Sequence, residues 1–214
     1  MGAPVWGGIR RGWTLREASC NQPLINDSQI YVYMIESLGH GRREMLDIGT
    51  KVPAKKVGRW FVNHADRASG EAITPLKLQK LVYYADAWFL ANFDRSLIPE
   101  DFQAWAHGPA IPELYAKYRH LGWDAIPAEA GSMPPEEVIP FIERVFEEYS
   151  QYSAKKLEKM THEELPWLEA RTGIAPEAAS TKNISKLSMR NFYAGRIGKS
   201  PIETLSGGCE AGPT

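Results

Sequence analysis

A strong helical pattern over residues 75–93 is the feature that most constrains the fold of this chain. Thr74 precedes Pro75, a pair that suits a helix start because the threonine hydroxyl caps free amides and proline fits the first turn. Apolar side chains then recur three and four positions apart, at Leu78, Leu81, Val82, Ala85 and Phe89. This spacing puts them on one face and predicts a core helix of about four to five turns, with Lys77, Lys80, Tyr84 and Trp88 flanking the apolar stripe.

Similar patterns predict short helices on both sides of the core helix. We expect them at residues 54–63, after Pro112, within residues 136–152, after Ser153, after Thr161 and at residues 185–193. The helix after Thr161 rests on a capping-box pattern that ends at Glu164. The proline-rich segment 99–112 predicts a loop with at most one short β element, near residues 100–106. The expected fold is mainly α, a single compact globular domain of about six to seven short helices.

The two ends of the chain lack this patterning. Residues 1–44 contain no lysine and no sustained apolar period, which predicts a loosely ordered N-terminal extension. The alternative is that Met45 is the true start residue. Residues 198–214 are rich in glycine and poor in large apolar side chains, which predicts a flexible tail. The expected helical domain therefore covers residues 45–197.

Composition names no partner and argues against several classes of function. The 25 Lys plus Arg nearly balance the 26 Asp plus Glu, so long-range attraction to nucleic acid or to anionic membrane is weak. The two cysteines, Cys20 and Cys209, have no metal-ligand spacing. No apolar run reaches the ~18 residues of a spanning helix. We therefore expect a cytoplasmic protein in a reducing compartment, without metal, cofactor or membrane partner.

Enzyme motifs are missing as well. The chain has no glycine-rich phosphate loop, no HExxH and no GxSxG, so we expect neither an enzyme nor a small-molecule substrate. His107 is the best placed histidine, in a loop between Trp105 and Pro109. Two interpretations stay open: its imidazole serves a site, or its ring nitrogens bond backbone carbonyls and lock the loop.

A basic patch is the feature that a DNA-binding function would need. Lys77 and Lys80 could form one with Lys55, Lys56 and Arg59 if the first two helices lie side by side, with Tyr83 and Tyr84 nearby. No helix-turn-helix spacing accompanies these residues. A DNA-binding transcriptional regulator of its own operon or of a mobile element is therefore the second hypothesis for the function of this chain.

Two motifs give the chain a family resemblance. Residues 73–85 have the sequence ITPLKLQKLVYYA, and residues 104–112 have AWAHGPAIP with Tyr115 shortly after. Together with Thr161-His162 and Pro166-Trp167, they resemble the Panacea domain family, also described as SocA-like or GepA-like. The likeness extends roughly over residues 45–197.

The resemblance implies an antitoxin of a type II toxin–antitoxin pair, which binds and neutralises a protein toxin directly. It further implies links to phage defence and mobile elements, and in some relatives delivery of the toxin to a ClpXP-type protease. An interface of this kind covers about 800 Å² per partner and uses a few aromatic or arginine anchors. Because of their polar and aromatic character beside the loop, the candidate contact residues are Lys77, Lys80, Tyr84, Trp105, His107 and Tyr115.

Overall fold

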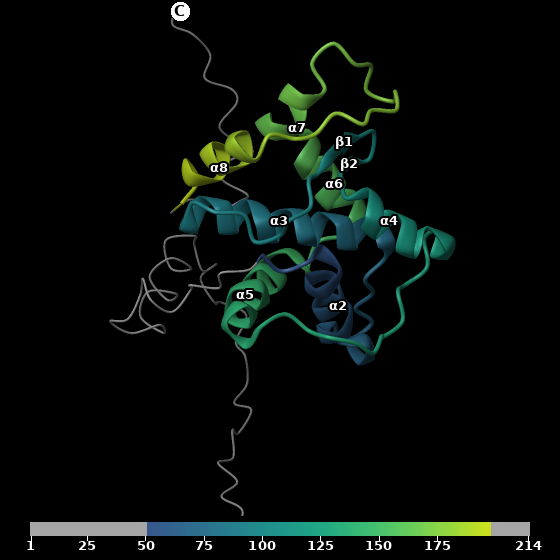
Figure 1. Ribbon diagram of the computed structural model, residues 1–214. Coiled ribbons are helices and arrows are strands. Elements are labelled where there is room, and N and C mark those ends of the chain that lie inside the picture. Colours follow the sequence, from purple (N-terminus) through teal and green to yellow (C-terminus); the bar gives the residue numbers. More distant parts are fainter. Residues whose placement is uncertain (1–50, 198–214) are drawn as a thin grey trace, which may run out of the picture.

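The computed structural model describes residues 51–197, and one long helix, α3 (Pro75–Phe93), runs through their middle. Figure 1 shows α2 (Ala54–His64) and α5 (Ile139–Tyr149) on one side of α3. On its other side lie α7 (Leu165–Ala170) and α8 (Lys186–Ala194). As predicted, the Thr74 hydroxyl caps α3 by accepting a hydrogen bond from the Lys77 amide, and Pro75 occupies its first turn.

The remaining elements are short and complete a mainly α fold, as predicted. Within residues 51–197 there are seven α-helices and one two-stranded antiparallel sheet. The elements not yet introduced are α4 (Pro112–Tyr118), α6 (Ala154–His162), the 3₁₀ helices Arg67–Ser69, Arg119–Leu121 and Glu136–Val138, and the strands β1 (Gln103–Trp105) and β2 (Gly108–Ala110).

One local prediction was incomplete and another was wrong. The segment near residues 100–106 contains β1, but a second strand follows it, because Gly108 at φ +90° turns the chain back to pair with Trp105. Thr161 does not cap a new helix. It is buried inside α6, where its hydroxyl donates to the Glu158 carbonyl, and α7 instead begins after Glu164. Helix α6 continues past Thr161 because Leu157, Met160 and Thr161 form one buried face.

The core gathers around α3, which is buried on nearly its whole circumference. Its apolar stripe is buried as predicted, and aromatic side chains fill the opposite face. Tyr84 stacks on Tyr149 of α5 with ring centroids 3.9 Å apart, and Trp88 meets Tyr193 of α8 edge-on at 5.0 Å. Large rings thus close the gaps between helices too short to pack by aliphatic contacts alone.

Asp86 fixes the loop after α3 from within the core. Its side chain is fully buried, and Oδ1 accepts hydrogen bonds from the amides of Leu97 and Ile98 at 2.7 and 3.2 Å and from the Ser96 hydroxyl. Oδ2 pairs with Lys186 of α8. A buried carboxylate is tolerated only with such a full set of donors.

Residues 1–44, Met45, Cys20, Cys209 and residues 198–214 lie outside the described residues, so the predictions made for them stay predictions. Between residues 51 and 197, no helix has the length and apolar character needed to cross a membrane.

Replacing Asp86 with alanine is expected to lower the free energy of unfolding by about 3 kcal/mol, because two buried amides and Lys186 lose their acceptor. Urea unfolding followed by circular dichroism measures the change. Asp124→Ala, at an exposed aspartate, is the matched control and should change the free energy by less than about 0.5 kcal/mol. Equal effects of the two substitutions would contradict the role given to Asp86.

Candidate functional site

Polar side chains of α3 form hydrogen bonds with the β1–β2 hairpin and with the residue that follows it. Lys80 is only 1% exposed, and its Nζ donates to the Pro109 carbonyl at 2.9 Å. The Gln79 amide bonds both backbone groups of Ile111: Oε1 accepts from the Ile111 amide at 2.8 Å, and Nε2 donates to its carbonyl at 3.3 Å. These bonds fix the end of β2 and the start of α4 on the central helix.

Two further side chains hold the other strand. Arg171 Nη1 donates to the Ala104 carbonyl at 2.8 Å, and Trp167 Nε1 donates to the Trp105 carbonyl at 3.0 Å. Both are buried. A hairpin of two three-residue strands has too few ladder bonds to be stable alone, so these buried donors set its position.

Gly108 is required at the close approach of the hairpin to α3 and α6. A Cβ atom here would lie 2.7 Å from Lys80 Nζ and 2.7 Å from the Thr161 hydroxyl oxygen, and φ is +90°. Both the crowding and the backbone conformation exclude a side chain. The glycine in the AHGP sequence of residues 106–109 therefore follows from the turn geometry.

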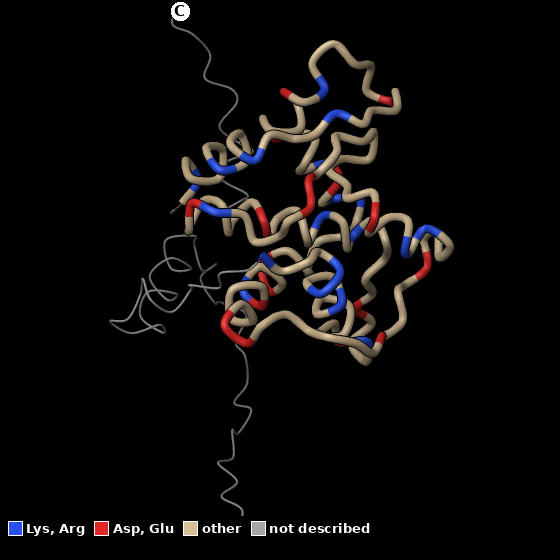
Figure 2. The backbone as a smooth tube through the Cα atoms, viewed as in Figure 1, with Lys and Arg blue, Asp and Glu red and all other residues tan. Residues whose placement is uncertain are grey.

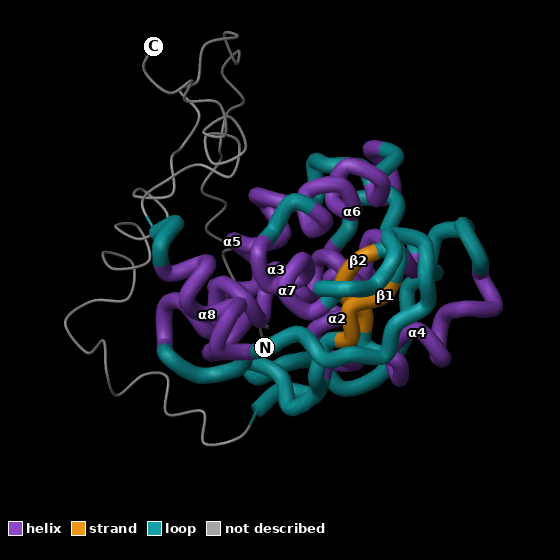
Figure 3. The backbone as a smooth tube through the Cα atoms, turned by 90° about the horizontal axis from the view of Figure 1, so that it is seen from above, coloured by secondary structure: helices purple, strands orange, loops and turns teal. Residues whose placement is uncertain are grey.

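The outer side of the hairpin joins a surface built from four segments, which we call the hairpin face. It consists of the exposed or half-buried Trp105, His107, Tyr115, Trp123 and Lys155 and of the largely buried Glu158. Trp105 meets Tyr115 of α4 edge-on, with ring centroids 4.9 Å apart. The side chain of His107 is 67% exposed, Tyr115 is 43% exposed and Trp123 is 69% exposed. Figure 3 shows the hairpin in orange between α4 and α6.

An ionic network links the hairpin to α6. His107 Nδ1 lies 3.0 Å from Glu158 Oε1, and Lys155 Nζ lies 2.8 Å from Glu158 Oε2. Burial alone would raise the pKa of Glu158, but the hydrogen bonds from Lys155 and His107 hold it below its usual value. Lys155 also lies 5.6 Å from the ring centroid of Trp123, so the network reaches an aromatic side chain that is 69% exposed.

A buried carboxylate, that of Glu164, lies at the centre of a cluster of three tyrosine side chains. The hydroxyls of Tyr83, Tyr84 and Tyr193 donate to Glu164 at 3.2, 3.2 and 2.7 Å. Burial raises the pKa of Glu164 to about 7, although the tyrosine hydrogen bonds oppose the rise. Burial likewise lowers the pKa of Lys80 to about 7, against the attraction of Glu158 and Glu164. Both groups are closed off from solvent, so the cluster ties α3, α7 and α8 together rather than meeting a ligand.

The structure separates the six predicted contact residues into two sets. Trp105, His107 and Tyr115 lie together on the hairpin face. Lys77, Lys80 and Tyr84 are buried, and the prediction that they face a partner was wrong. The pattern of one apolar stripe suggested outward-facing flanks, but α3 is covered on both sides.

Sequence reasoning missed the other half of the face, namely Trp123, Lys155 and Glu158. The spacing of Lys155 and Glu158 is that of an i,i+3 ion pair, which only hints at a pair. Nothing local in the sequence indicates that Trp123 lies beside them, because that contact joins segments far apart in the chain.

The contacts of His107 match neither of the two interpretations completely, a role in a site or a lock on backbone carbonyls. Its ring bonds a carboxylate, Glu158, rather than a backbone carbonyl, and it remains exposed. The imidazole therefore connects the turn to α6 and still faces solvent.

The basic patch expected for DNA binding does not form. Four of its expected members are buried, namely Lys77, Lys80, Tyr83 and Tyr84. Only Lys55, Lys56 and Arg59 of the expected patch remain, and they do not form it alone. Figure 2 shows Lys and Arg on α2, α4 and α8 alike rather than gathered around one element.

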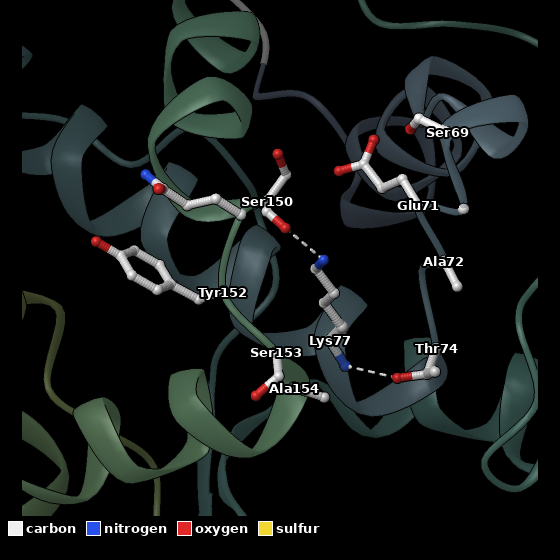
Figure 4. Close-up of a pocket in the computed structure, with 11 residues that line it drawn as sticks. Ser69, Glu71, Ala72, Thr74, Lys77, Ser150, Tyr152, Ser153 and Ala154 are labelled. Atoms are coloured by element: carbon white, nitrogen blue, oxygen red, sulfur yellow. Dashed lines mark hydrogen bonds between the residues drawn. The ribbon is translucent and has the colours of Figure 1, made fainter. Parts of the chain in front are cut away.

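Lys77 lines an open cavity of about 710 Å³ between the start of α3 and the α5–α6 junction. Figure 4 shows its Nζ directed at the Ser150 carbonyl, to which it donates at 2.5 Å. Ser150 is the C-terminal cap residue of α5, where a cation is favourable. Burial lowers the pKa of Lys77, while the nearby Glu71 opposes this. The ammonium is thus engaged by the protein itself.

Across residues 51–197, no group of three or more His, Cys, Asp or Glu side chains is arranged to hold a metal ion.

One known family model matches the part of the chain that contains this surface. Residues 78–168 match the family model Antitoxin SocA-like, Panacea domain. The match confirms the predicted resemblance, over a shorter stretch than residues 45–197. It supports a role related to toxin–antitoxin systems. Searches of curated proteins and of solved structures found no match. All six residues of the hairpin face lie within the Panacea match.

Gly108→Ala is expected to lower the free energy of unfolding by about 3 kcal/mol, because the new methyl group adds a clash with Lys80 and Thr161 to the backbone strain. Gly70→Ala is the matched control: its φ is +87° and nothing lies within 4 Å of a Cβ there. That variant should lose only about 1 kcal/mol. Thermal unfolding compares the two, and equal losses would contradict the close approach at Gly108.

Glu164→Gln is expected to change how stability depends on pH. Because the pKa of Glu164 is raised from 4.5 to about 7 on folding, its contribution to stability is complete below pH 4.5 and is lost as pH rises through 7. The stability of the natural chain relative to the variant should therefore fall by about 3 kcal/mol across this range. Urea unfolding at a series of pH values measures it, with the exposed Glu163→Gln as control. A difference that does not vary with pH would contradict the burial of Glu164.

Proposed function

We propose that this chain is an antitoxin of the type II class, which neutralises a protein toxin by binding it directly through the hairpin face. The observation that carries the proposal is the Panacea match at residues 78–168, which contains the whole face. The neutralising action is non-enzymatic in this proposal and takes place in the cytoplasm. Delivery of the toxin to a ClpXP-type protease remains a prediction of the family resemblance.

The physical character of the face supports a protein partner. Exposed Trp and Tyr side chains are the residue types that contribute most to protein interfaces. Here Trp105 and Tyr115 form a pair, and Trp123 is linked to it through Lys155, Glu158 and His107. The hairpin is already fixed by buried donors, so little conformational entropy is lost when a partner binds.

Regulation of its own operon by DNA binding was the alternative. The basic patch that it would need is not present in the described residues, and we do not propose it.

Growth of a bacterial host tests the proposal. Each reading frame next to this gene is expressed from an inducible promoter, with and without the chain. The expected result is a growth arrest by one product that co-expression of the chain relieves, accompanied by a complex of the two proteins in size-exclusion chromatography. Arrest that is not relieved, or the absence of any toxic product, contradicts the proposal.

The double variant Tyr115→Ala/Trp123→Ala is expected to weaken toxin binding by about thirtyfold or more, which corresponds to about 2 kcal/mol, because two exposed aromatic anchors are removed. Isothermal titration calorimetry with the purified toxin measures the dissociation constant. Leu187→Ala, at an exposed leucine of α8 outside the Panacea match, is the matched control. If Leu187→Ala impairs binding and rescue while the double variant does not, the interface lies elsewhere.

A further inference from the structure

The solvent-facing side of α6 consists of lysines. Leu157, Glu158, Met160 and Thr161 of this helix are buried, and the exposed positions are Lys155, Lys156 and Lys159. We call these three residues the lysine face. Lys155 and Lys159 are one helical turn apart, about 6 Å along the axis, so the three charges occupy a small area.

The protein neutralises this face only in part. Lys155 pairs with the largely buried Glu158 at 2.8 Å, and that carboxylate is shared with His107. Lys159 lies 3.9 Å from the exposed Glu163, a separation and exposure that give weak pairing. The Lys156 side chain has no hydrogen bond or ion pair within residues 51–197. Positive charge therefore exceeds negative charge at this surface.

The excess is local, because the whole chain has a net charge of −1. The preceding helix α5 has the opposite character, with the glutamates Glu143 and Glu147 partly exposed. Charge of one sign on one helix face selects partners by complementarity.

An exposed aromatic ring adjoins the lysine face. Trp123 lies under Lys155, 5.6 Å from its Nζ to the ring centroid, and through His107 the surface continues to Trp105 and Tyr115. Basic and apolar contacts are thus available side by side, which fits a partner segment with both acidic and apolar side chains.

We infer that the lysine face receives an acidic segment of the protein partner, with at least two carboxylates within about one helical turn and an apolar side chain that packs on Trp123. The inference rests on the proposed function and specifies the chemistry of its partner. A nucleic acid fits less well, because three clustered cations neutralise few phosphates.

Fluorescence anisotropy with a defined probe tests the inference without the toxin. The probe is a labelled peptide of about twelve residues with glutamates at helical spacing and one leucine, and its comparison is the same peptide with lysines in place of glutamates. The full chain should bind the acidic peptide only, and the dissociation constant should rise about tenfold between about 50 and about 300 mM NaCl. Lys156→Glu/Lys159→Glu should raise it at least about tenfold.

Lys51→Glu/Lys55→Glu, which reverses the charge of two exposed lysines in and just before the first turn of α2, is the matched control and should bind the peptide as the natural chain does. Circular dichroism verifies that both variants are folded. The inference is overturned if the acidic peptide does not bind, or if the α6 variant binds it unchanged. It is equally overturned if oligothymidylate binds more tightly than the peptide.

The same variants separate this inference from the proposed function. Once the toxin is known, growth rescue is compared between the natural chain and Lys156→Glu/Lys159→Glu. Equal rescue by both would support antitoxin activity and would show that the lysine face does not contribute to it. Self-association that the α6 variant abolishes, measured by light scattering, would assign the face to a second copy of the chain and also overturn the inference.

Discussion

The fold depends on the hydrogen bonds that satisfy polar side chains on the buried helix α3. Helix α3 is covered on both sides, yet it carries Lys77, Gln79, Lys80 and Asp86. An unpaired polar group at such depth would destabilise the fold by several kcal/mol. Each of the four instead bonds the backbone of a surrounding segment: the end of α5, the start of α4, strand β2 and the loop after α3.

This arrangement links the interior to the surface proposed to bind a toxin. Lys80 and Gln79 hold β2 and the residue after it from α3, and Arg171 and Trp167 hold β1 from the other side. The short hairpin presents Trp105 and His107 in a fixed position because these buried donors reach its carbonyls and because residues 182–184 pair with the backbone of residues 102–104. Position and exposure of the surface are therefore consequences of core chemistry, and a change at Lys80 would act on the surface through the hairpin.

Two buried ionisable groups, Glu164 and Lys80, lower the stability of the folded state, because burial disfavours the charged form of each. Glu164 and Lys80 both have pKa values shifted by burial to about 7, in opposite directions. Each is harder to keep charged than it would be in water. The three tyrosine hydroxyls on Glu164 and the Pro109 carbonyl on Lys80 offset part of that cost and, at the same time, connect elements that are far apart in the chain.

The sequence by itself determined most of the helices, most of their boundaries and the resemblance to the Panacea domain family. Thr74, Pro75 and the stripe from Leu78 to Phe89 predicted α3 correctly because capping and periodicity are local properties. Only the tertiary structure decided which polar residues face solvent. Lys77, Lys80 and Tyr84 lie inward because helices cover both sides of α3, and Trp123 meets Lys155 because α4 and α6 flank one hairpin. Burial and long-range contacts depend on how elements pack, which no local pattern contains.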